Sequence, residues 1–117
     1  MSLFVRDGFD AALSALPGVT FVDQWEARVA KVGGKVFCLL SDNAPFRVVF
    51  KCGEESFDIL TSLEGVTQAA YFAKRQWVSV AQDSELSDDD VRAYAARSHA
   101  LVAKGLTKKL QAELGII

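Results

Sequence analysis

The sequence is poor in cysteine, histidine and proline, and it contains no long run of apolar residues. Cys38, Cys52 and the single His99 do not stand at the short spacings of metal ligands, so no metal site is expected. No segment approaches the roughly 18 apolar residues of a membrane-spanning helix. The first residues also lack the basic start and apolar run of a signal peptide. These absences predict a cytoplasmic protein with free thiols and with neither a membrane nor a metal partner.

The chain also lacks the short motifs that mark common enzyme classes. Neither the GxGxxG nor the GxxxxGK[ST] nucleotide-binding pattern occurs, and there is no GxSxG nucleophile elbow. The acidic pairs and triplets at 54–55 and 88–90 stand where helices are expected to start, which explains them without acid–base catalysis. Cys38 lies within an expected strand, so it is expected to pack rather than to react with His99. The sequence therefore predicts no catalytic residues, no cofactor and no enzymatic activity.

Apolar side chains are abundant, and their spacing predicts an α+β fold. Hydrophobic residues make up 50% of the 117 residues, and no linker or repeat divides the chain, so one domain is predicted over residues 1–117. The segments with strand-like runs are 19–25, 28–32, 35–40, 46–51, 69–73 and 77–81. The segments with helical spacing are 7–16, 54–63, the one that follows the expected N-cap Ser87, and 106–114.

Short connections between the strands predict antiparallel pairing. Gly33-Gly34 is typical of a two-residue hairpin turn, and residues 42–45 form the next turn. The element order, α-β(3–4)-α-β(2)-α-α, therefore predicts an antiparallel sheet of about five to six strands with helices mainly on one face.

The same turns predict which side chains share a face of the sheet, because side chains alternate along each strand. The face expected beneath the helices holds Ala30, Phe37, Leu39, Val48 and Phe50. The other face holds Val29, Lys31, Val36, Cys38, Arg47, Val49 and Lys51. This second face has small apolar side chains at its centre and basic ones around them, which suits an anionic ligand, a nucleic-acid backbone or a partner protein.

The charges are unevenly distributed along the chain, whose net charge is −2. Residues 28–51 contain five basic residues and a single acid, Asp42, whereas acids gather in 54–58 and 83–90. One interpretation is an interaction surface. The other is that the basic side chains only solvate the sheet and discourage its pairing with other chains.

Five segments in order along the chain resemble the MmcQ/YjbR family. They are residues 16–20 (LPGVT), 32–37 (VGGKVF), 49–51 (VFK), 71–80 (YFAKRQWVSV) and 98–102 (SHALV). The resemblance implies a compact α+β fold, similar to type III secretion chaperones and frataxin-like proteins, with a double-wing motif predicted to bind DNA. The hairpins around 33–35 and 74–76 correspond to the wings. The family often has tyrosine where this chain has His99.

Two binding functions follow as hypotheses. The first is a DNA-binding module whose phosphate contacts come from Lys31, Lys35, Arg47, Lys51, Lys74 and Arg75. The alternative is a protein-interaction or homodimerising module that buries the apolar centre of the second face. Trp25 and Trp77 stand at strand ends and are expected to pack in or beside the core, although Trp77 also stands next to basic residues and is a candidate for stacking on a base.

Overall fold

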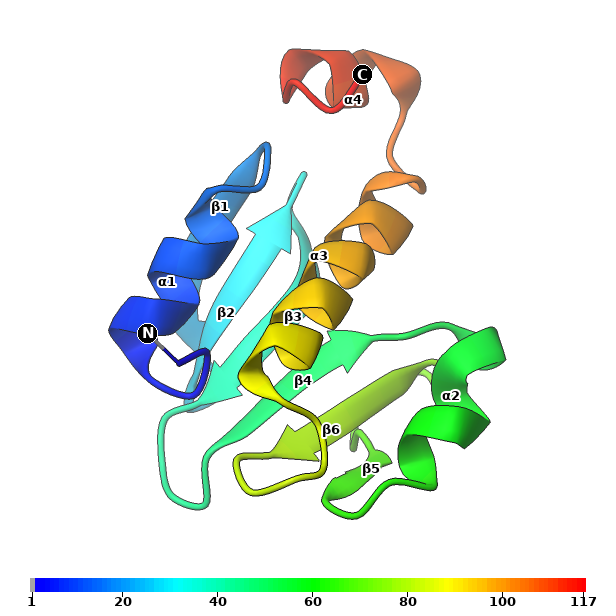
Figure 1. The fold of residues 1–117 in the computed structure, drawn as a ribbon. Helices are drawn as coiled ribbons and strands as arrows, with labels where there is room; N and C mark the ends of the chain where they lie inside the picture. Colours follow the sequence, from blue (N-terminus) through cyan, green and yellow to red (C-terminus); the bar gives the residue numbers. More distant parts are fainter. Residues whose placement is uncertain (1) are drawn as a thin grey trace.

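The strands of the chain form one antiparallel sheet in the order β1-β2-β3-β4-β6-β5, seen in a computed structural model that describes residues 2–117 (Figure 1). The strands are β1 (Val19–Gln24), β2 (Ala27–Val32), β3 (Lys35–Ser41), β4 (Arg47–Lys51), β5 (Val66–Gln68) and β6 (Trp77–Ala81). The helices are α1 (Arg6–Ser14), α2 (Glu54–Thr61), α3 (Asp88–Ala103) and α4 (Lys108–Glu113). The α+β fold with an antiparallel sheet is therefore as the sequence predicts.

Helices α1, α2 and α3 lie on one side of the sheet (Figure 1). Helix α3 crosses β3 and β4, α1 lies against β1, and α2 packs beside β5 and β6. Ser87 caps α3, and a reciprocal hydrogen bond from Asp90 completes the predicted capping box. The opposite side of the sheet carries no helix among residues 2–117 and is called the open face from here on.

The main core lies between the sheet and the helices, as expected for a sheet covered on one side. Phe9 and Leu13 of α1 and Val91 of α3 are fully buried there. They meet the predicted inner residues of the sheet, which are Ala30, Phe37, Val48 and Phe50. A second, smaller apolar cluster lies on the open face around Val49 and Trp77.

A β-bulge between β2 and β3 changes the predicted faces. Ala30 pairs with Cys38, but Lys31 pairs with Val36, so Phe37 is an additional residue in β3. Phe37 and Cys38 consequently both lie in the core beneath the helices. The prediction that Cys38 lies on the open face was wrong, because it assumed uninterrupted alternation along β3.

The register between β3 and β4 also differs by one residue from the prediction. Leu39 pairs with Val49 and Leu40 pairs with Val48, because the connection between these strands includes Phe46. Leu39 packs with Val49 in the cluster on the open face. The prediction that Leu39 faces the helices was therefore wrong.

The strand predicted at 69–73 is absent, and β5 lies immediately before it. The backbone N–H of Ala69 donates to the carbonyl of Trp77, and the chain then leaves the sheet as a loop over residues 69–76, called the 69–76 loop below. Tyr71 and Arg75 have φ angles of 69° and 63° in this loop. Such left-handed residues do not continue a β-strand, which is why the apolar run of the sequence was misleading.

Ser98 of α3 joins two strands at the bulge. Its hydroxyl accepts a hydrogen bond from the backbone N–H of Lys51 at 2.8 Å and donates one to the carbonyl of Phe37 at 2.6 Å. Ser98 is fully buried. The side chain thus links Phe37 to Lys51 immediately beyond Cys38 and Phe50, the last paired residues of β3 and β4.

His99, the next residue of α3 after Ser98, also holds two parts of the chain together. The ring is almost fully buried, and Phe37 lies edge-on to it with 5.2 Å between the ring centroids. Its Nε2 lies 2.7 Å from the carbonyl oxygen of Pro17, and a carbonyl only accepts, so Nε2 carries the proton. His99 therefore ties α3 to the connection between α1 and β1.

Candidate nucleic-acid interface

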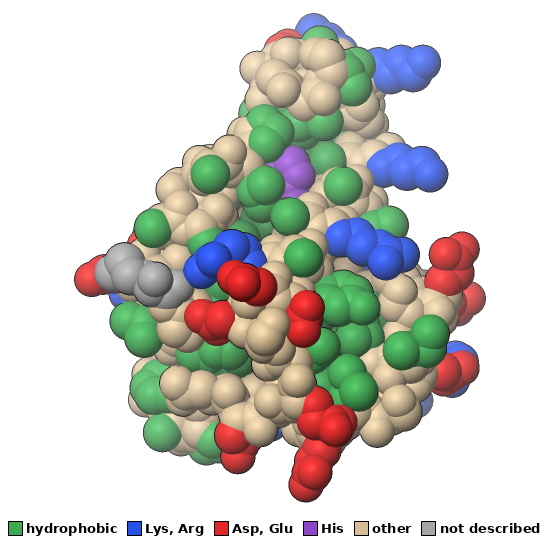
Figure 2. Space-filling model, viewed as in Figure 1, with side chains coloured by type: hydrophobic (Ala, Val, Ile, Leu, Met, Phe, Trp, Pro, Cys, Tyr) green, Lys and Arg blue, Asp and Glu red, His purple; other side chains and the backbone are tan. Residues whose placement is uncertain are grey.

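The open face carries cations without acids among its strand residues. The side chains that alternation places there belong to Thr20, Val22, Gln24, Ala27, Val29, Lys31, Val36, Leu39, Ser41, Arg47, Val49, Lys51, Thr67, Trp77, Ser79 and Ala81. Three of the six predicted DNA-contacting residues are among them, namely Lys31, Arg47 and Lys51. The helix-covered side is different, because acidic and basic side chains are mixed on it (Figure 2).

The other three predicted residues are not among these strand side chains, and one of them is already paired. Lys35 is exposed at the β2–β3 turn, and its backbone pairs with that of Val32, so alternation turns it from the open face. Lys74 is exposed in the 69–76 loop. Arg75 forms an ion pair with Asp58 of α2, in which its Nη2 donates to both carboxylate oxygens at 3.0 and 3.1 Å. The structure therefore gathers half of the predicted set.

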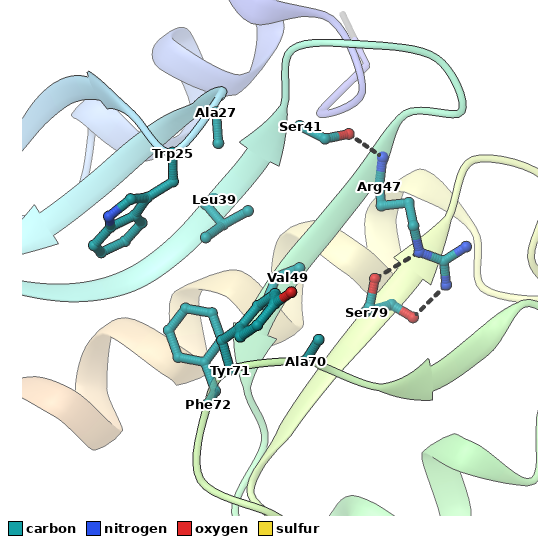
Figure 3. A pocket seen from close by; sticks show the side chains of 10 residues that line it. All are labelled: Trp25, Ala27, Leu39, Ser41, Arg47, Val49, Ala70, Tyr71, Phe72 and Ser79. Atoms are coloured by element: carbon teal, nitrogen blue, oxygen red, sulfur yellow. Dashed lines mark hydrogen bonds between the residues drawn. The ribbon is translucent and has the colours of Figure 1, made fainter.

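Arg47 is held in place by neutral groups. Its Nε donates to the Ser79 hydroxyl at 2.6 Å, and its Nη2 donates to the Ser79 carbonyl at 2.9 Å (Figure 3). Within residues 2–117 no carboxylate lies within 4.0 Å of this guanidinium. Its positive charge is thus fixed on the open face without a neutralising partner.

A groove of about 560 Å³ runs over the open face beside Arg47 (Figure 3). Leu39 and Val49 form its apolar floor, and Ser41 and Ser79 add hydroxyl groups. Its remaining lining comes from the β1–β2 turn, the start of β2 and the 69–76 loop, as Trp25, Ala27, Ala70, Tyr71 and Phe72. A groove of this volume is large enough for a small planar ligand.

Two aromatic side chains border the groove without packing into the protein. Trp25 is 65% exposed and Tyr71 is completely exposed, although both are large and apolar. The prediction that Trp25 packs beside the core was wrong. Both have left-handed backbones, with φ of 56° at Trp25 and 69° at Tyr71. Sequence reasoning missed this pair because both residues belong to the strand-like runs 19–25 and 69–73, and aromatic residues in strands are typical of the core.

Trp77 packs in the protein as predicted, and its side chain is almost fully buried. Its ring stacks on Phe72 with 4.4 Å between the centroids, and the two rings belong to the apolar cluster around Val49. This stack fastens the 69–76 loop onto the open face. The position of Tyr71 is therefore set by a packed neighbour.

The two cysteines are buried and unbonded to each other, as free thiols. Burial raises the pKa of both thiols, because desolvation disfavours the thiolate. No group of side chains that could hold a metal ion occurs in the described part of the chain. None of the helices formed by residues 2–117 is long and apolar enough to cross a membrane.

We expect Cys38 and Cys52 to resist thiol reagents in the folded protein. The thiolate is the reactive species, and both burial and the raised pKa keep it scarce. Titration with an aromatic disulfide at mildly alkaline pH should show slow release of the chromophore, and addition of urea should make both thiols react at once. Immediate reaction of one equivalent in the native protein would contradict this expectation.

The profile of the YjbR family matches residues 14–101. The chain belongs to the YjbR family. The resemblance in the sequence is thereby confirmed, and the family match covers β1 to β6 and most of α3. No curated protein matches the chain.

Two solved structures share the fold. A DUF419-domain protein of Deinococcus radiodurans superimposes with a TM-score of 0.86 at 23% identity, over 97% of this chain and 89% of that one. A protein from Pseudomonas syringae gives a TM-score of 0.69 at 17% identity, over 83% of this chain and 97% of that one. At these identities the likeness shows the YjbR-type fold alone.

Proposed function

We propose that this YjbR-family protein is a non-enzymatic, cytoplasmic DNA-binding module and that DNA lies across the open face of its sheet. The observation that carries the proposal is the charge of that face. Lys31, Arg47 and Lys51 share it, and no strand residue on it is acidic. The overall charge of −2 does not oppose binding there, because the local field of a surface decides what it attracts at close range.

The proposed contacts are few and electrostatic. Lys31 and Lys51 lie toward the β2–β3 turn, and Arg47 begins β4 at the other end of the same strands. Contacts from these three cations to phosphates predict binding without sequence specificity. About three such contacts also predict a log–log salt dependence with a slope between about −2 and −3.

The test is a fluorescence-anisotropy titration of labelled DNA at about 50 and 200 mM salt. The double variant Lys31→Glu/Lys51→Glu should bind at least tenfold more weakly and should show a shallower salt slope, because two phosphate contacts become repulsive. The matched control is Lys108→Glu/Lys109→Glu on α4, which changes the net charge equally at exposed side chains that do not belong to the strands of the open face. An equal loss in the control, or no binding by the wild type at low salt, would refute the proposal.

The exposed rings of Trp25 and Tyr71 favour a second candidate, which is self-association or protein binding through the same face. A homodimer would cover these rings and the groove. Light scattering at micromolar concentration measures it, since one chain has a mass of 12.7 kDa. A mass of one chain that does not rise with concentration would exclude the homodimer.

A further inference from the structure

We infer that the groove on the open face receives an unpaired nucleobase, so that the preferred ligand is single-stranded DNA rather than duplex. The inference rests on the proposed function and narrows it. It starts from Trp25 and Tyr71, the two exposed aromatic residues that border the groove.

Both aromatic residues have a left-handed backbone. At Trp25 it belongs to the two-residue turn of Trp25 and Glu26 that joins β1 to β2. At Tyr71 it belongs to the 69–76 loop, and left-handed residues other than glycine gather at ligand-binding sites. Trp25 and Tyr71 contribute neither to the main core nor to the smaller cluster on the open face. Their conformations have one common result, which is two accessible rings at the lining of one groove (Figure 3).

The groove matches the chemistry of a base and its phosphates. Leu39 and Val49 offer an apolar floor, and the two rings offer flat faces on which a base stacks. Arg47 at the groove supplies a fixed positive charge, since Ser79 holds its Nε and Nη2. A channel with positive charge and aromatic platforms is the usual combination for single-stranded nucleic acid.

A duplex does not use these features. Its bases are stacked on one another, so their flat faces are not available to Trp25 or Tyr71. Lys31, Arg47 and Lys51 still attract its phosphates, so duplex binding is expected to be weaker but present. The preference for single strands therefore depends on the aromatic pair, whereas binding itself depends on the cations.

The experiment compares an oligothymidine of about ten nucleotides with a duplex of equal length at one salt concentration. The wild type should bind the single strand at least tenfold more tightly, since stacking of a base on the rings adds to the phosphate contacts. Trp25→Ala/Tyr71→Ala should remove this preference and leave duplex affinity and its salt slope unchanged. The control is Ile59→Ala, which removes an exposed apolar side chain from α2.

The fluorescence of Trp25 tests directly whether a base lies against its ring. Trp77→Phe leaves Trp25 as the only tryptophan of the chain, so quenching of its fluorescence by oligothymidine reports stacking. Saturable quenching with the affinity found by anisotropy is expected. Unchanged fluorescence despite binding would overturn the inference.

The outcomes separate this inference from the proposed function. Equal affinity for both forms of DNA, unaffected by Trp25→Ala/Tyr71→Ala, would overturn the inference and leave DNA binding intact. Absence of binding to either form at low salt would overturn both. A fall in solution mass in the double aromatic variant would show that a second copy occupies the groove, which would also overturn the inference.

Discussion

Ser98→Ala is expected to lower the free energy of unfolding by about 2–4 kcal/mol, because two buried backbone groups lose their hydrogen-bond partner. The hydroxyl accepts from the N–H of Lys51 and donates to the carbonyl of Phe37, in a fully buried place. Each buried polar group that loses its partner costs about 1–3 kcal/mol. Alanine fills nearly the same space, so the lost hydrogen bonds and not a cavity account for the effect. Urea unfolding measures the change as a lower midpoint with an unchanged slope.

Ser14→Ala is the matched control for this substitution. Ser14 ends α1, is exposed, and donates only a local bond to the carbonyl of Ala11. Its replacement should change stability by less than about 0.5 kcal/mol. If Ser98→Ala were equally mild, β3 and β4 would be closing directly across the bulge, and the bridging role of the hydroxyl would be wrong.

The bulge also explains where sequence reasoning succeeded and where it failed on the fold. The Gly33-Gly34 pair indicated the β2–β3 turn. The spacing of apolar residues indicated five of the six strands that residues 2–117 form, β5 being the exception, and the burial of Phe50. This spacing did not indicate that Phe37 is an additional residue, or that Ser98 of α3 bonds to its carbonyl. Ser98 stands 61 residues from Phe37 in the sequence, and no local pattern connects them. Registers that depend on such distant contacts are not contained in the spacing of a strand.

Sequence reasoning also succeeded for some residues of the candidate site and failed for others. Lys31, Arg47 and Lys51 were placed together correctly, since their alternation along β2 and β4 is regular. Arg75 was wrongly expected to be free for a phosphate. Its partner Asp58 belongs to a helix, and sequence spacing does not locate this helix relative to the loop. The aromatic border of the groove was missed because exposure depends on the path of a turn and not on residue type.

Gly65→Ala is expected to lower the free energy of unfolding at least as much as Ser98→Ala does, by about 2–5 kcal/mol. The φ angle of 87° is strained for a residue with a side chain, which costs about 1–2 kcal/mol. An added Cβ would also lie 2.7 Å from the Cα of Ser84. That atom belongs to the backbone and cannot rotate away, so the chain must shift, as in an overpacked core, at about 1–3 kcal/mol.

Gly34→Ala separates the two contributions. Gly34 has a similar φ of 81°, but nothing lies within 4 Å of an added Cβ, so only the strain remains. Urea unfolding should therefore give a smaller loss for Gly34→Ala, and the difference measures the contact with Ser84. Equal losses would show that the segment around Ser84 yields freely.

Gly65→Ala and Gly34→Ala should also differ in their effect on the open face. The carbonyl of Gly65 accepts from the N–H of Ala81 at 2.8 Å and lies 3.5 Å from Nη2 of Arg47. A shift of Gly65 should therefore loosen the support of the Arg47 guanidinium as well as the start of β5. We expect Gly65→Ala to weaken DNA binding at temperatures where it is still folded, whereas Gly34→Ala should bind as the wild type does. Unchanged binding by folded Gly65→Ala would mean that Ser79 and Thr67 fix the guanidinium of Arg47 without the Gly65 carbonyl.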